Sequence, residues 1–158
     1  MNFEEYCEDI LDQHVALMSE EQRAQASKGF EEFQNGAQKR RTQLNDKALD
    51  ARSVAKLFGG KALTGTKKQK EWAEKIRAEK LRGMTDKQAI LASAPDGLLT
   101  SSKFWIENRS ASAADIGNFV EQQKALLNKY KDAKANGDHE SVSEIAPQYN
   151  ALTAKWGF

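Results

Sequence analysis

The chain has 158 residues, of which 39% are hydrophobic and 30% are charged, and its formal net charge is +1. This composition is typical of a globular protein and excludes a long disordered chain. No apolar stretch reaches the roughly 18 residues of a membrane span, and the N-terminus lacks the basic and apolar regions of a signal peptide. We therefore expect a cytoplasmic protein that does not contact a membrane.

The charge is unevenly distributed along the chain. Residues 1–37 carry two Lys or Arg against nine Asp or Glu, residues 38–87 carry fifteen against six, and residues 88–158 carry seven against eight. A basic middle region thus follows an acidic N-terminal segment. Such asymmetry favours attraction to a polyanion, or attraction between the two segments within one chain or between chains.

Residues 3–18 have the pattern of an amphipathic helix, and its apolar stripe includes Cys7 and His14. We interpret both as packed side chains, because no set of catalytic partners accompanies either of them in the sequence. The single cysteine also suits a reducing compartment. Ser19 and Gln22 have capping-box spacing, which predicts the start of a second helix.

Apolar residues then recur every seven positions, which predicts one long helix with a heptad-like seam. The seam residues are Phe30, Ala37, Leu44, Ala51 and Phe58, with Phe33, Ala48 and Ala55 on the adjoining row. This helix either lies across a bundle or pairs with a second copy. Gly59 and Gly60 end it, and residues 61–66 are the expected boundary between an N-terminal helical module, 1–60, and a C-terminal helical module, 61–158.

Thr66 and Gln69 have capping-box spacing, so another helix is predicted to begin there. Trp72 is the large aromatic residue on its apolar face, and a short helix downstream carries Trp105. We expect the two tryptophans to pack in one small core, because aromatic residues at helical spacing usually face a core. In the alternative, Trp105 is partly exposed and stacks on a base or a partner, with Arg109 beside it.

Two long amphipathic patterns follow, and Asn136 and Gly137 separate them. Asp138 is a predicted N-cap for the last helix, which Pro147 should bend or split. The pair is predicted to form an antiparallel helical hairpin. The whole chain is therefore predicted to be all-α, with about six or seven helices in one compact body or two small helical modules.

The central region also carries a resemblance. Residues Gly65–Arg77 read G-T-x-K-Q-x-x-W-A-x-x-I-R, and Phe104–Arg109 read F-W-I-x-x-R. Together they resemble a segment of small uncharacterised accessory proteins of phages and plasmids, over about residues 63–109. The resemblance implies an accessory protein of a mobile element, in the cytoplasm of a bacterial host, and it brings no catalytic residues.

No pattern in the sequence predicts an enzyme, a metal site or a cofactor. His14 and His139 are far apart, and neither has a partner at metal-ligand spacing. The helix start at Gly65, Thr66 and Lys67 has free N–H groups that can hold one anion, but helix capping explains these residues more simply. We therefore expect a non-enzymatic protein with neither a cofactor nor a metal.

Three functions remain open on the sequence. The first is a binding protein of a phage or mobile element, an inhibitor of a host defence system of the anti-CRISPR type, whose partner is a host protein such as a nucleic-acid enzyme complex. The second is a nucleic-acid-binding accessory factor that uses residues 38–87. The third is a structural homo-oligomer, at least a homodimer, formed through the 30–58 seam. The predicted binding residues are Lys39, Arg40, Arg41, Lys67, Lys68, Arg77, Trp105 and Arg109.

Overall fold

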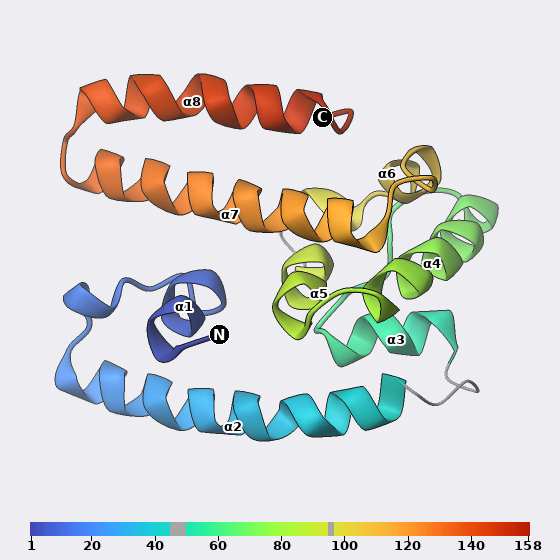
Figure 1. Ribbon diagram of the computed structural model, residues 1–158, viewed down its shortest axis with the longest axis horizontal. Coiled ribbons are helices and arrows are strands. Elements are labelled where there is room, and N and C mark those ends of the chain that lie inside the picture. The colour runs from blue at the N-terminus through green and yellow to red at the C-terminus, as the bar shows by residue number, and fades with distance from the viewer. Residues whose placement is uncertain (45–49, 95–96) are drawn as a thin grey trace. The chain divides into compact units, whose positions relative to one another are not determined.

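The computed structural model describes residues 1–44, 50–94 and 97–158. Within these ranges the regular structure is helical, and two residues, Thr64 and Ser101, form an isolated parallel bridge. The all-α prediction is confirmed, with eight α-helices among the described residues instead of six or seven (Figure 1). The helices and the two short 3₁₀ turns, labelled η, are α1 (Phe3–Asp9), η1 (Val15–Leu17), α2 (Glu20–Leu44), α3 (Ala51–Leu57), α4 (Lys67–Arg82), α5 (Asp86–Ser93), η2 (Leu98–Thr100), α6 (Ser102–Glu107), α7 (Ala113–Ala135) and α8 (His139–Ala154).

Contacts group the chain into two units, Met1–Leu49 and Asp50–Phe158. The expected boundary at residues 61–66 falls inside the second unit, because α3 packs against α4 across that segment. Residues 50–60 are thus grouped with the C-terminal helices and not with the N-terminal module 1–60.

The first helix is shorter than the predicted helix 3–18. Asn2 and Glu5 form a capping box at its start, but α1 ends at Asp9. Asp12 then has a φ of 57°, which a regular helix does not accommodate. His14 is exposed and accepts a hydrogen bond from the N–H of Ala16 as the cap of η1, so its predicted place on a packed stripe is wrong.

The first unit has a small core between α1 and α2. Cys7 is fully buried beside Tyr6 and Ala26, as the sequence predicted for the cysteine. The Tyr6 ring lies 5.4 Å from the Phe30 ring and 5.3 Å from the Phe33 ring, measured between centroids. The predicted capping box of Ser19 and Gln22 is present before α2.

The predicted single helix from Phe30 to Phe58 is interrupted. Asp50 has extended backbone angles, and its carboxylate accepts the N–H groups of Arg52 and Ser53 at the start of α3. A residue that caps a new helix in this way cannot continue an old one. Ala48, on the row adjoining the predicted seam, lies outside the described residues.

In the second unit, α4 packs against α3 and α6, α5 packs against α7, and α7 and α8 form the predicted antiparallel hairpin (Figure 1). The largest fully buried side chains of this second unit include Trp105, Phe119 and Leu81. Asp138 caps α8 as predicted, whereas Pro147 lies inside a helix that continues to Ala154. These contacts fix the orientation of α4, on which the candidate site lies.

Candidate binding surface

Helix α4 begins at the predicted capping box. The Thr66 hydroxyl accepts the N–H of Gln69 at 3.3 Å, and the Gln69 side chain accepts the N–H of Thr66 at 3.0 Å. The first turn carries Lys67 and Lys68 and no acidic residue. Because the N-terminus of a helix already has a partial positive charge, this end of α4 is electropositive.

The inward side of α4 is apolar except for one ion pair. Its buried hydrophobic residues are Ala73, Ile76, Ala78 and Leu81. Glu74 and Arg77 lie among them, with 8% and 2% of their surfaces exposed. Buried charges of this kind require partners, because an unpaired charge in the interior is very costly.

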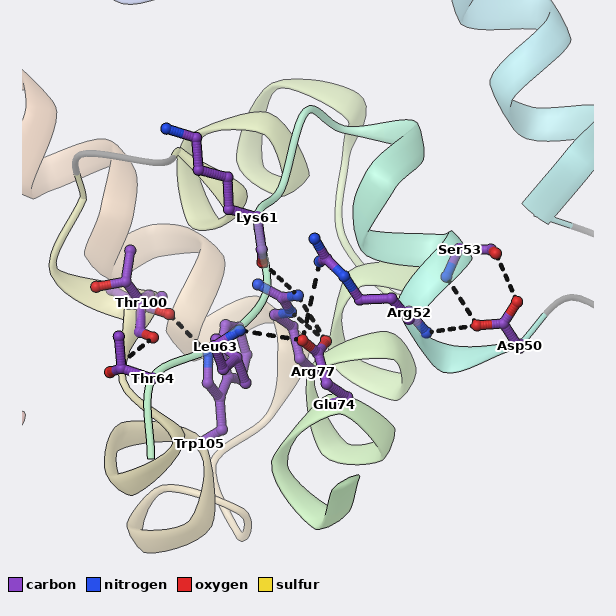
Figure 2. Close-up of polar contacts among 11 residues, drawn as sticks. Asp50, Arg52, Ser53, Lys61, Leu63, Thr64, Glu74, Arg77, Thr100 and Trp105 are labelled. Carbon is purple, nitrogen blue, oxygen red and sulfur yellow. Dashed lines mark hydrogen bonds and ion pairs between the residues drawn. The ribbon is translucent and has the colours of Figure 1, made fainter. Parts of the chain in front are cut away.

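Figure 2 shows how that pair ties α4 to the segment before it. The Arg77 guanidinium donates to Glu74 Oε2 through both Nε and a terminal nitrogen, and it also donates to the carbonyl of Lys61 at 3.0 Å. Glu74 Oε1 accepts the N–H of Leu63 at 3.3 Å and lies 3.8 Å from a terminal nitrogen of Arg52. Burial lowers the pKa of Arg77 below its usual value, and Glu74 opposes that shift. The network therefore fixes which side of α4 faces inward.

The opposite side of α4 presents Trp72 to solvent. Half of its surface, 50%, is exposed. Lys68 and Lys75 lie about one helical turn before and after it, and both are exposed. We define the Trp72 patch as these three residues together with the exposed Lys67 and Glu71.

The prediction that Trp72 packs in a core with Trp105 is wrong for Trp72. The inward positions of α4 are occupied by alanines, Ile76, Leu81 and the Glu74–Arg77 pair, and the indole lies on the other side of the helix. Trp105 alone is a core residue. It is fully buried, and its Nε1–H donates to the carbonyl of Leu99 at 2.9 Å.

Some of the predicted binding residues of the second unit are therefore exposed and others are buried. Lys67 and Lys68 are exposed together on the first turn of α4. Arg77 and Trp105 are buried, so neither belongs to a charged or stacking surface. Arg109 is exposed, and its guanidinium donates to the carbonyl of Ile106 at 2.9 Å.

The other predicted cations lie on α2, in the first unit. Lys39 and Arg41 are exposed, whereas Arg40 is partly buried with its guanidinium 4.9 Å from the centre of the Phe33 ring. The basic region 38–87 is thus distributed over two units.

Sequence reasoning missed Trp72 and Lys75 as surface residues. One signal was available in the sequence, since Glu74 and Arg77 are spaced to pair on one side of a helix. Had that pair been placed inward, Trp72 would have been predicted to face solvent.

Two grooves of about 380 and 300 Å³ lie on the α7–α8 hairpin, and neither lining contains a histidine or cysteine. In the described part of the chain, no three His, Cys, Asp or Glu side chains group as metal ligands. No described helix is long and apolar enough to cross a membrane.

No protein-family model matches the sequence, and no curated protein is significantly similar to it. Function is therefore inferred from the residues of the Trp72 patch.

Proposed function

We propose that this protein acts without catalysis, by binding a single-stranded nucleic acid through the Trp72 patch. The observation that carries the proposal is a half-exposed tryptophan between two exposed lysines on a helix held by buried contacts. An indole left in water exposes a large apolar area that a stacked base would cover. Such stacking tolerates any sequence, because every base has a π-face.

The charge around the indole supports the same function. Lys68 and Lys75 extend from either side of Trp72, and flexible lysine side chains suit contacts with successive phosphates. Lys67 adds a third cation at the electropositive helix start. The whole second unit, Asp50–Phe158, carries eighteen Lys or Arg against thirteen Asp or Glu, which favours approach of a polyanion.

A second candidate function is binding of a host protein by an inhibitor encoded on a mobile element. The observation that favours it is Glu71 inside the patch, with the exposed Glu79 farther along α4. A carboxylate repels phosphates but can pair with a cation of a protein partner. Tryptophan is also enriched among the residues that dominate protein interfaces.

The proposal is tested by fluorescence anisotropy with labelled single-stranded DNA and RNA at about 50 and about 200 mM salt, a range over which phosphate contacts weaken steeply. We expect salt-dependent binding that Lys68→Glu/Lys75→Glu weakens. The control, Lys129→Glu/Lys134→Glu, makes the same change in net charge at two exposed positions of α7 and should retain most of the affinity.

Glu71→Gln separates the two candidate functions. Removing this carboxylate should tighten nucleic-acid binding, because one repulsion with the phosphates is lost. The same substitution should weaken a protein complex in which Glu71 pairs with a cation. If the wild-type protein binds neither labelled strand at the lower salt, the nucleic-acid proposal is wrong and the protein partner becomes the better candidate.

A further inference from the structure

The smaller groove of the α7–α8 hairpin has a mostly apolar lining. Its volume is about 300 Å³, and the residues that line it are Leu127, Tyr130, Ala146, Tyr149 and Asn150. The Tyr149 hydroxyl accepts a hydrogen bond from Gln123 Nε2 at 3.1 Å, so a contact between the two helices holds one wall in place. We call this feature the tyrosine groove.

The apolar residues of the hairpin are incompletely covered. In α8, all of whose residues are described, the buried residue is Thr153, whereas the large apolar side chains stay partly exposed. These side chains are Val142, Ile145, Tyr149 and Leu152. Leu127 and Tyr130 of α7 are partly exposed as well. A helix is stabilised when its apolar stripe packs against a neighbouring element, so a further element on the groove would complete the burial.

The two edges of the tyrosine groove differ in charge. On α7, Lys124 lies three residues before Leu127 and Lys131 four residues after it, so the three side chains share one row of the helix. The row with the same spacing on α8 consists of Ser143, Ala146 and Asn150. Neither row contains a carboxylate, so the edge formed by α7 is cationic and the edge formed by α8 is uncharged.

We propose that the tyrosine groove is the docking site for an amphipathic helix of a partner protein, with Asp or Glu beside its apolar stripe. A helix that binds in a groove anchors apolar residues one turn apart, which suits a lining that comes from two helices. Acidic residues beside the stripe pair with Lys124 and Lys131, as flanking charges do in helical bundles. The bound helix, α7 and α8 then form a three-helix unit.

The lining favours a helix over a nucleic acid. Leu127 and Ala146 have no ring on which a base can stack, but they suit the apolar stripe of a helix. The groove lies on α7 and α8, whereas the Trp72 patch lies on α4. The docking site is therefore additional to the proposed function and does not depend on it.

The first test uses a displayed library of amphipathic helices as the probe. Every member has leucine along one face, and the positions beside that face vary among Glu, Gln and Lys. Selection is for binding to the wild-type protein in an excess of free Ala146→Trp, whose added indole fills the groove. We expect the enriched helices to carry Glu, because it pairs with the lysines of α7. Enrichment of Lys, or the absence of any helix that survives this competition, would overturn the inference.

Matched tryptophan variants show whether the selected helix enters the groove. A synthetic peptide of that helix should lose its binding to Ala146→Trp. It should keep its binding to Ala125→Trp, which adds the same ring at an exposed position of α7 outside the lining. Equal affinities for the two variants would place the peptide elsewhere on the protein and refute the docking site.

Charge reversal tests the cationic edge without changing the apolar lining. Lys124→Glu/Lys131→Glu should weaken binding of the acidic peptide about tenfold, and it should strengthen binding of the same peptide with Lys in place of Glu. An unchanged preference for the acidic peptide would contradict the pairing with α7.

The competing occupant is a nucleic acid, and labelled single strands test it. Ala146→Trp should bind the strand as the wild type does, and Trp72→Ala should bind the peptide as the wild type does. A loss of strand binding in Ala146→Trp would assign the groove to nucleic acid and overturn the inference. If the wild type binds the peptide but no strand, the proposed function fails while the docking site stands.

Discussion

The buried ion pair of α4 makes a quantitative prediction for Arg77→Met. Glu74 is 8% exposed, so the substitution leaves a carboxylate in the interior without the guanidinium that neutralises it. Breaking a buried pair in this way costs about 3–5 kcal/mol. The N–H of Leu63 and the side chain of Arg52 remain close to the carboxylate. We therefore expect a loss near the lower limit, about 3 kcal/mol in the free energy of unfolding.

Replacing both charges, in Glu74→Met/Arg77→Met, should recover most of that loss, because apolar residues of similar volume often substitute well for a buried pair. Urea unfolding followed by tryptophan fluorescence measures both variants, since all three tryptophans belong to the unit Asp50–Phe158. A loss below about 1 kcal/mol for Arg77→Met, or a double variant no more stable than the single one, would refute this explanation of how α4 is held.

Three further predictions concern stability and reactivity. Trp105→Ala should cost about 3–5 kcal/mol in the same urea assay, whereas Trp72→Ala should cost about 1 kcal/mol or less because half of that side chain is already in water. Hydrogen bonds from Ser141 lower the pKa of Asp138. The ionised carboxylate therefore stabilises the fold fully at pH values above the ordinary pKa of Asp, and this contribution is lost as the pH falls through the lowered pKa. Asp138→Asn still caps α8 but does not titrate, so the melting temperatures of the variant and the wild type should converge in acid; a constant difference would contradict this. Burial raises the pKa of the Cys7 thiol, so an aromatic disulfide reagent should react slowly with the native protein and rapidly in urea, and equal rates would show that the thiol is accessible.

Local signals in the sequence predicted much of the second unit. The capping box at Thr66 marks the start of α4, and Asp138 caps α8. Each of these depends on residues only three positions apart, so the sequence contains the whole interaction. The antiparallel hairpin follows from the short connection between its two helices.

The errors arose where distant contacts or a competing cap decided the structure. Asp50 interrupts the predicted long helix because its carboxylate caps α3, a role that a heptad pattern does not reveal. The size and helical spacing of Trp72 predict a core position. Its exposure depends on Arg77, which bonds to the carbonyl of Lys61, sixteen residues earlier, and so turns the other side of α4 inward. Periodicity carries no information about such a partner.

The most direct test of the proposed function is the affinity of a labelled single strand for three proteins, the wild type, Trp72→Phe and Trp72→Ala, at about 50 mM salt. Stacking of a base on an aromatic ring is worth about 1–3 kcal/mol. We therefore predict that Trp72→Ala binds at least fivefold more weakly, while Trp72→Phe retains most of the affinity. Equal affinities of the wild type and Trp72→Ala, with the helical circular dichroism of both unchanged, would contradict a stacking role for Trp72.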